Sequence, residues 1–333
     1  PLRIVFLGSD PIALPLLNWL AGEGSALGKV VAVFTQPDRP AGRGQKIAAN
    51  EIKTWALARA LPVHQPDKLT DEVRAQLAAS NADLSLVMAY GHLLRDEFIA
   101  TPRLGTVNLH ASILPRYRGA SPIQTAIANG ERETGVSLMR IVRRLDAGPV
   151  ADVETVSIAA LDTALEIESK LAMACVPLVA RTLPLLRAGQ LDFREQADTA
   201  ATYCRRLVKD DGVLDFATPA SMLAARINGL FPWPACGAEI NGQRVKFGLA
   251  DVVADDLSSD ENGLPEPGVV LGPDGDGLRI GTGHGRLRIR RLQRPGGKML
   301  EAHEFLRGFP ISVGTRLPSH PLPTLVSTTP FKK

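Results

Sequence analysis

Short apolar runs alternate with amphipathic stretches through the first half of the chain. Residues 2–7, 30–35 and 83–89 are dominated by aliphatic and aromatic side chains, and each run ends at polar, glycine or proline positions typical of turns. Helical periodicity fills the intervals between them, over about residues 11–22, 50–60 and 70–80. Strands that alternate with helices predict an α/β fold: a Rossmann-like, mostly parallel sheet with right-handed crossovers and flanking helices.

The next buried strand opens a stretch, residues 105–124, that carries polar side chains where a strand ends. Its sequence is GTVNLHASILPRYRGASPIQ, and the strand positions are otherwise apolar or β-branched. Asn108 and His110 stand two residues apart, so both side chains leave the same face of the strand. Polar groups at this place are costly unless they are paired or used, and ligands bind at the carboxyl edge of open α/β sheets. The residues alone leave two interpretations open: a turn-forming asparagine with a satisfied core histidine, or a functional site.

A helix is predicted near residues 121–129, and two further strands at 134–142 and 150–157. These two strands are expected to be antiparallel across the turn that contains Asp146.

A long helix is then predicted to run to about residue 187. Thr163 and Glu166 have capping-box spacing at its start, and Pro177 is expected to kink or interrupt it. The most apolar region of the chain, residues 171–185, lies inside this helix. It is expected to be too short and too interrupted to span a bilayer.

The pattern changes after this helix. Residues 189–208 look like a linker, and beyond them one helix is predicted near 219–229. Otherwise short strands separated by glycine- and proline-rich turns indicate a smaller, OB-like β-barrel domain; they lie at 235–240, 243–249, 267–271, 277–281 and 286–292. We therefore expect a catalytic domain at 1–188, a linker at 189–208 and the β-barrel domain at 209–333.

Composition limits the kinds of partner, cysteine site and cellular location that the sequence predicts. The chain has 333 residues and a net charge of +3, so overall charge does not indicate a nucleic-acid-binding protein. Three cysteines, Cys175, Cys204 and Cys236, are odd in number and widely spaced, which disfavours a disulfide framework and a zinc site. An apolar strand starts at Leu2 with no signal peptide before it. A reducing, cytoplasmic location is therefore expected.

The distribution of charge along the chain indicates more about binding partners than the net charge does. Residues 36–50, QPDRPAGRGQKIAAN, are expected to form a long loop that carries Arg39, Arg43 and Lys46. Such a loop is either a solvated surface segment or an arm that contacts phosphates.

A second basic element lies in the carboxyl-terminal domain. Residues 279–298 contain no acidic side chain, and Arg286, Arg288 and Arg290 alternate along one face of a predicted strand. This stripe is either an electrostatic footprint for a polyanion or a solvated face that balances the acidic segment 251–276.

Asn108, His110 and Asp146 are the candidate chemical constellation. Histidine transfers protons near neutral pH, an asparagine amide donates to a developing oxyanion, and a carboxylate orients an imidazole. Ser112 lacks the surroundings of a nucleophile elbow. The turn after residue 7 has only Gly8 and lacks G-x-G-x-x-G, which disfavours a nicotinamide site.

Residues 108–124 resemble the signature of the folate-dependent formyltransferase superfamily. In that signature an Asn-x-His at a strand end precedes Ser-Leu-Leu-Pro and Arg-Gly, and an Asp-x-Gly follows later; Asp146-Ala147-Gly148 fits that last element. Further segments are similar to the branch that acts on methionyl-tRNA; they are PAGRG at 40–44, AYG at 89–91, PWP at 232–234, QRPGGKM at 293–299 and FLRG at 305–308.

This resemblance implies a transferase that moves the formyl group of 10-formyltetrahydrofolate, its co-substrate, to the α-amino group of methionyl initiator tRNA. The amine attacks the formyl carbon, and a tetrahedral intermediate collapses without a covalent enzyme intermediate and without a metal. Asn108 would stabilise the oxyanion, and His110 would polarise the formyl oxygen or relay protons. Asp146 would orient His110 and help to accept the proton of the amine.

The resemblance also implies where the substrates bind. The residues expected near folate are Ala89, Tyr90, Gly91, Ser112, Ile113, Leu114, Pro115 and Leu145. Those expected to contact tRNA are Arg39, Arg43, Lys46, Arg205, Arg206, Arg286, Arg288, Arg290 and Lys298. A monomer without membrane association is expected.

Three rival interpretations remain. The nearest keeps the chemistry and changes the acceptor, as in a sugar-nucleotide amine formyltransferase or a hydrolase of formyltetrahydrofolate. The others are a nucleic-acid-binding protein with an inactive α/β domain and a nicotinamide oxidoreductase. The two basic elements favour tRNA as the partner.

Overall fold

The computed structural model describes residues 1–41, 46–253 and 266–331; of Ala41 and Lys46 it describes the backbone. These residues form two compact units, each built from several segments of the chain. The first contains residues 1–118, 135–156 and 168–201, and the second contains 119–134, 157–167 and 202–333. Two short internal segments, 119–134 and 157–167, thus pack with the carboxyl-terminal part. The domain bounds at 188 and 208 stay a prediction.

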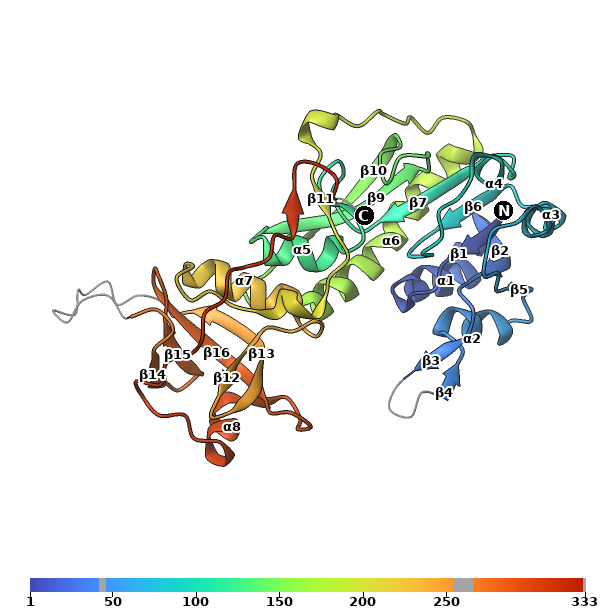
Figure 1. The fold of residues 1–333 in the computed structure, drawn as a ribbon. Coiled ribbons are helices and arrows are strands. Elements are labelled where there is room, and N and C mark those ends of the chain that lie inside the picture. Colours follow the sequence, from blue (N-terminus) through green and yellow to red (C-terminus); the bar gives the residue numbers. More distant parts are fainter. Residues whose placement is uncertain (42–45, 254–265, 332–333) are drawn as a thin grey trace. The chain divides into compact units, whose positions relative to one another are not determined.

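A seven-stranded sheet forms the centre of the first unit (Figure 1). Its strands follow the order β10-β9-β7-β6-β1-β2-β5; they are β1 (Leu2–Leu7), β2 (Gly28–Phe34), β5 (Val63–His64), β6 (Leu84–Val87), β7 (Thr106–His110), β9 (Glu133–Arg140) and β10 (Val150–Ser157). The pairings from β5 through β2, β1 and β6 to β7 are all parallel, and β9 then pairs with β7 in the antiparallel sense. The prediction of a mostly parallel α/β sheet is confirmed.

Helices flank this sheet; they are α1 (Leu14–Ala21), α2 (Glu51–Leu57), α3 (Asp71–Ala79), α4 (Asp96–Ile99) and α6 (Ala164–Arg187). Short 3-10 helices of the same unit lie at Pro11–Ala13, Glu23–Ala26 and Asp198–Ala200, and the one at Lys209–Gly212 belongs to the second unit. Every residue of β6 is buried, as inner strands of a parallel sheet covered on both faces are.

The order of the strands locates the edge where a ligand is expected. The chain runs from β1 to β2 and β5 on one side, then returns to β6 and β7 on the other. The carboxyl ends of β1 and β6 therefore flank a topological switch point. The turn after β1 lies close to the residue that follows β6, since a Cβ on Gly8 would lie 2.4 Å from the carbonyl oxygen of Met88.

Helix α6 is 24 residues long and continues through both Pro177 and Pro184. Pro177 therefore does not interrupt the helix, and the alternative expectation of a kink stays a prediction. One bond of the expected capping box is present, since Thr163 N donates to Glu166 Oε2 at 2.8 Å. The Thr163 hydroxyl accepts from Leu165 N at 3.2 Å, one residue earlier than the box requires. By length and composition alone the whole helix could cross a membrane, whereas the expectation concerned the shorter region 171–185.

One stripe of α6 nevertheless lies inside the protein. Leu171, Cys175 and Leu178 are fully buried, and they recur at the spacing of a single helix face. Half of the most apolar window of the helix is buried. A core helix shows this pattern.

The described residues of the segment 36–50 include two short strands in place of the long loop that the sequence suggests. β3 (Arg39–Ala41) and β4 (Lys46–Ala48) pair in the antiparallel sense and make the arms of a β-hairpin. The two strands were not predicted, because each has only three residues and the segment around them is rich in glycine and proline.

The carboxyl-terminal part of the second unit is a curled antiparallel sheet that forms a half-barrel (Figure 1). Its strands are β12 (Gly237–Ile240), β13 (Gln243–Val252), β14 (Val270–Pro273), β15 (Leu278–Gly281), β16 (Arg286–Gln293) and β17 (Leu300–Glu301). Register shifts around Leu249 in β13 mark bulges, which bend a strand and increase its twist. The predicted small β-domain is confirmed.

Helices complete the core of the second unit; they are α5 (Pro122–Ala128), α7 (Ala220–Leu230) and α8 (Ala302–Gly308). Leu223 and Ile227 of α7 are fully buried with Phe247, Ile280 and Ile289 of the sheet. A separate three-stranded sheet has the order β18-β11-β8; its strands are β8 (Arg118–Gly119), β11 (Tyr203–Cys204) and β18 (Val326–Ser327).

Candidate active site

His110 is the last residue of β7, and it has a polar partner on each side of its ring. Nε2 lies 2.9 Å from the carbonyl oxygen of Tyr117. A carbonyl oxygen only accepts, so Nε2 carries the hydrogen of that bond. The neutral ring then presents Nδ1 as an acceptor, 3.7 Å from Oδ2 of Asp146. Two acceptors face each other across this gap, so a proton on Nδ1 or a bound donor is needed to link them.

Both partners of His110 have backbone conformations that non-glycine residues rarely adopt. Tyr117 has φ +58° and Asp146 has φ +48°. Such conformations persist only where the surroundings enforce them, and they concentrate at functional sites. The Asp146 turn also has no room for a larger residue two positions later, since a Cβ on Gly148 would lie 1.9 Å from the carbonyl oxygen of Arg140.

Asn108 precedes His110 by two residues on β7 and is half-buried. It stands opposite Val87 of β6 and Met139 of β9. Within the described part of the chain, its side-chain amide has no hydrogen-bond partner. A half-buried amide in this state is available to a ligand.

The loop between His110 and Tyr117 is held from inside. The Ser112 hydroxyl is buried and donates to the carbonyl of Arg116 at 2.7 Å. Ser137 of β9 accepts from Leu114 N at 3.1 Å and donates to the carbonyl of Ser112 at 2.7 Å. The Ser112 side chain is thus used within the loop.

The Asp146 turn is held by a residue that the sequence did not single out. Gln196 donates from Nε2 to the carbonyl oxygens of Asp146, at 2.8 Å, and Gly148, at 2.7 Å. Its Oε1 accepts from the guanidinium of Arg118, whose side chain is 1% exposed. Gln196 lies 78 residues from Arg118 in the chain, inside the segment predicted to be a linker. No signal at that sequence distance could have paired them.

Two family models match the chain. The one described as formyl transferase covers residues 2–183, and the one described as formyl transferase, C-terminal domain, covers residues 206–310. The chain belongs to the formyltransferase family. It is a transferase with the two-domain organisation of that family.

Curated relatives of this formyltransferase carry the name methionyl-tRNA formyltransferase. One from Ectopseudomonas mendocina is 41% identical over 300 residues, which cover 90% of this chain and 92% of the relative. One from Pseudomonas fluorescens SBW25 is 42% identical over 301 residues, with coverage of 90% and 92%.

Solved structures share the fold at lower identity. An N-formyltransferase from Helicobacter canadensis, in complex with folinic acid and dTDP-3-aminofucose, is 17% identical with a TM-score of 0.64, covering 88% of this chain and 100% of that one. HypX from Aquifex aeolicus in complex with tetrahydrofolic acid is 16% identical with a TM-score of 0.61, covering 96% of this chain and 51% of that one.

In the segment after β6 of this formyltransferase, the backbone can contact a ligand, whereas the Tyr90 ring is buried. Ala89 and Gly91 have positive φ, and the carbonyl of Tyr90 accepts from Gln36 Nε2 at 3.0 Å. The Tyr90 side chain is buried in an apolar cluster with Phe34 and Phe98. Its hydroxyl has no partner there, and burial raises its pKa. A folate contact through Tyr90 would therefore use main-chain atoms.

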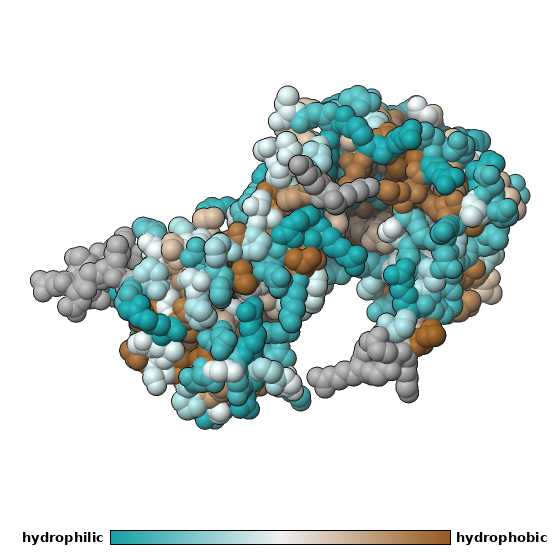
Figure 2. Space-filling view, viewed as in Figure 1, coloured by the Kyte–Doolittle hydropathy of each residue, from teal (hydrophilic) through white to brown (hydrophobic). Residues whose placement is uncertain are grey.

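The other residues expected near folate differ in exposure. Leu114 is buried, Ile113 and Pro115 are half-buried, and Leu145 is 56% exposed. Figure 2 shows hydrophobic side chains gathered on the surface over the part of the sheet that carries β6 and β7.

The hairpin residues expected to contact tRNA are described in part. Arg39 Nη2 donates to Gln36 Oε1 at 3.1 Å. Lys46 has its backbone in β4, and its side chain lies outside the described part of the chain. Arg43 lies outside the described residues.

Arg205 and Arg206 have different surroundings. Arg205 makes a bidentate pair with the fully buried Asp211, at 2.9 and 2.6 Å, and its Nε donates to the carbonyl of Thr324 at 3.2 Å. Arg206 and Lys298 are exposed. The guanidinium of Arg205 is therefore committed to a contact within its own unit.

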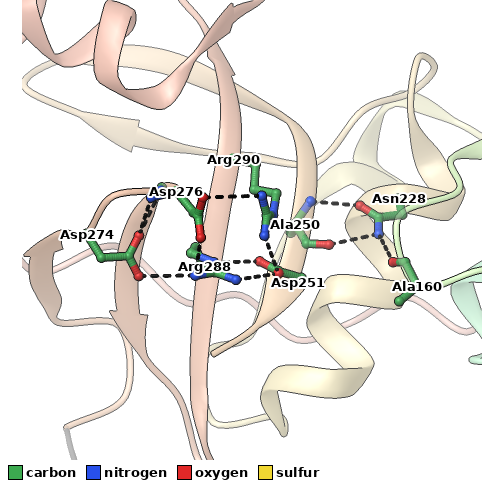
Figure 3. A network of polar contacts seen from close by, with 9 residues as sticks. Ala160, Asn228, Ala250, Asp251, Asp274, Asp276, Arg288 and Arg290 are labelled. Carbon is green, nitrogen blue, oxygen red and sulfur yellow. Dashed lines mark hydrogen bonds and ion pairs between the residues drawn. The ribbon is translucent and has the colours of Figure 1, made fainter. Parts of the chain in front are cut away.

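The arginine stripe of β16 is balanced by carboxylates of the same domain (Figure 3). Arg288 donates to both oxygens of Asp251, at 2.9 and 2.6 Å, and Arg290 donates to Asp251 Oδ2 at 2.9 Å. Asp274 and Asp276 lie 3.4 and 3.3 Å from Arg288 Nη1. Burial alone would raise the pKa of Asp251, and the hydrogen bonds from both arginines outweigh it and lower that pKa. Arg286 shares the outward face of the strand and is half-buried.

Among the described residues, no group of three or more His, Cys, Asp or Glu side chains has an arrangement that could hold a metal ion. The expectation of a reaction without a metal stays a prediction.

Proposed function

We propose that this formyltransferase moves the formyl group of 10-formyltetrahydrofolate to the α-amino group of methionyl initiator tRNA. The observation that carries the proposal is similarity to methionyl-tRNA formyltransferases over 90% of the chain. A folate co-substrate is supported by the family and by relatives of the same fold whose structures contain tetrahydrofolic or folinic acid.

Asn108 is the proposed donor to the formyl oxygen. Its amide lacks a partner within the described chain, so it donates to a bound substrate without first breaking a bond. As the amine attacks, negative charge grows on that oxygen, and a fixed donor in a half-buried site stabilises it. The amide also fixes the orientation of the formyl group before attack.

His110 and Asp146 are the proposed proton acceptors. The attacking amine must lose a proton as its bond to the formyl carbon forms. Nδ1 of His110 and the Asp146 carboxylate present acceptors to each other at 3.7 Å, and a shared proton turns this contact into an attraction. Nε2–H stays bound to Tyr117 throughout, so the ring holds its orientation while Nδ1 changes state.

The β3–β4 hairpin and the exposed cations of the second unit are the proposed tRNA contacts. Arg39, Arg43 and Lys46 belong to the hairpin, and Arg206 and Lys298 are exposed. Arg205, Arg288 and Arg290 are held by carboxylates within the protein, so we assign them a weaker part in binding phosphate than their sequence pattern indicates. The monomeric state and cytoplasmic location stay predictions.

One assay tests the proposal. The purified protein is given 10-formyltetrahydrofolate with methionyl initiator tRNA, with a free amino-sugar nucleotide, or with water alone. We expect formylated methionyl-tRNA as the main product, at a rate well above that of hydrolysis. Faster formylation of the amino sugar would assign the chain to the rival class of acceptors.

A further inference from the structure

Arg118 is a buried cation whose donors converge on one segment. Its Nε and Nη2 donate to Oε1 of Gln196 at 3.0 and 2.8 Å, and its Nη1 donates to Asp198 Oδ1 at 3.0 Å. Arg144 pairs with the same Asp198 at 2.6 Å. The Arg118 side chain is only 1% exposed. A buried guanidinium is stable only where its N–H groups have acceptors, so the hydrogen bonds to Gln196 and Asp198 fix its position.

The amide of Gln196 has only one orientation that satisfies both sides. A guanidinium only donates, so the oxygen must face Arg118 and the nitrogen must face the Asp146 turn. The two amide hydrogens then bind the carbonyls of Asp146 and Gly148, on either side of Ala147. A reversed amide would place donors against donors and acceptors against acceptors.

The two hydrogen bonds from Gln196 hold the turn at a place where it borders a surface pocket. A pocket of about 380 Å³ that is open to the surface borders the turn, next to Ala147, Gln196 and Asp198. Asp146 also holds an unfavourable φ of +48°. The turn faces solvent on that side, and the two hydrogen bonds from Gln196 restrain its backbone there.

The same arginine is adjacent to the other partner of His110. Tyr117, whose carbonyl accepts from His110, immediately precedes Arg118 in the chain. One buried side chain therefore connects the residue that fixes the ring of His110 with the turn that presents Asp146.

We propose that Gln196, oriented by Arg118, is a positioning residue that holds the Asp146 carboxylate toward His110. The inference rests on the proposed function, since it assigns Gln196 to the proton-accepting pair of that reaction. Gln196 acts through the backbone of the turn and need not touch the substrate.

The test is Gln196→Glu, which keeps an acceptor for Arg118 and removes both donors to the turn. Gln190→Glu makes the same chemical change at an exposed position of the same segment and is the matched control. We expect Gln196→Glu to lower kcat by on the order of 100-fold, as a misplaced catalytic group does, with KM for both substrates within about twofold. Turnover within about twofold of the parent protein would overturn the inference.

A double-mutant cycle separates positioning from general damage to the fold. If Gln196 acts through Asp146, Gln196→Glu added to Asp146→Asn lowers kcat little further. If the two losses multiply, the inference is wrong. Melting temperatures of all variants identify any loss that comes from unfolding.

A measurement without substrate keeps the inference apart from the proposed function. The imidazole ¹⁵N shifts of His110, assigned with a His110→Gln variant, should move in Gln196→Glu and Asp146→Asn and stay unchanged in Gln190→Glu. Unchanged shifts in Gln196→Glu would overturn the inference. A parent protein that fails to formylate methionyl-tRNA would instead overturn the proposed function alone.

Discussion

Single residues of this formyltransferase have roles that depend on what their side chains already bind. Asn108 and His110 share a strand face, yet His110 is held by Tyr117 whereas the Asn108 amide has no partner within the described residues. Ser112, two residues further on, uses its hydroxyl inside the loop. Proximity along the chain therefore says less about function than unused hydrogen-bonding capacity does.

Asn108→Ala removes the proposed donor to the formyl oxygen. We expect kcat to fall by about 100- to 1,000-fold, the usual cost of losing one oxyanion donor. Binding of methionyl-tRNA should not change, because the amide is proposed to contact the formyl group and not the tRNA. Turnover is measured under single-turnover conditions and binding by filter retention; a loss confined to tRNA affinity would contradict the assignment.

Arg205 and Arg206 are neighbours with opposite expected roles. Arg205→Ala leaves the buried Asp211 carboxylate unpaired and should lower the free energy of unfolding by about 3 kcal/mol. Arg206→Ala removes an exposed side chain and should change that energy by less than about 0.5 kcal/mol. Urea unfolding measures both variants, and equal effects would refute the distinction.

At the level of elements, the hairpin β3–β4 is tied to the sheet by a network of polar side chains. Gln36 accepts from Arg39 in the first arm and donates to the carbonyl of Tyr90 after β6. Asn50 and Gln65 both donate to the carbonyl of Gln36, at 3.3 and 2.9 Å. The base of the hairpin is thus anchored at the carboxyl edge of the sheet.

Neutralising the hairpin should change how tRNA affinity depends on salt. Arg39→Gln and Lys46→Gln each remove one potential phosphate contact, so the slope of log affinity against log salt should become less steep by about one unit for each. Lys29→Gln, an exposed change in β2, is the control. An unchanged slope in both hairpin variants would make the hairpin a surface feature.

The sequence predicts elements well where burial alone determines them. The apolar runs of β1, β2 and β6 and the contact between Thr163 and Glu166 at the start of α6 required no knowledge of distant residues. The hairpin was missed because its arms are only three residues long and lie in a segment that is rich in glycine and proline. The burial of Tyr90, the pairing of Arg205 with Asp211 and the clamp from Gln196 depend on tertiary contacts, which periodicity does not encode.

At the level of the whole molecule, charge is compensated inside the second unit. The pKa of Asp251 is lowered from its ordinary 3.8 because hydrogen bonds from Arg288 and Arg290 outweigh burial. A group whose pKa is lower in the folded state stabilises that state above its unfolded pKa. The contribution is lost as the pH falls through the folded value.

The stability of the parent protein should therefore fall on acidification below about pH 4, in the range of an ordinary aspartate. Asp251→Asn should be less stable at pH 7, and its stability should depend less on pH in the acid range. Thermal unfolding between pH 3 and pH 7 measures both effects. Asp192→Asn, at an exposed carboxylate, is the control. Parallel pH curves for the parent and Asp251→Asn would contradict the role of the ion pairs.

The position of Gln196 bears on how this chain can be dissected. A fragment that stops at residue 188 retains Asn108, His110 and Asp146 but lacks the side chain that grips the Asp146 turn. A fragment that stops at residue 201 retains that grip together with Asp198, the second acceptor of Arg118. A fragment that keeps the restraint on the proposed Asp146 turn must therefore extend past Gln196.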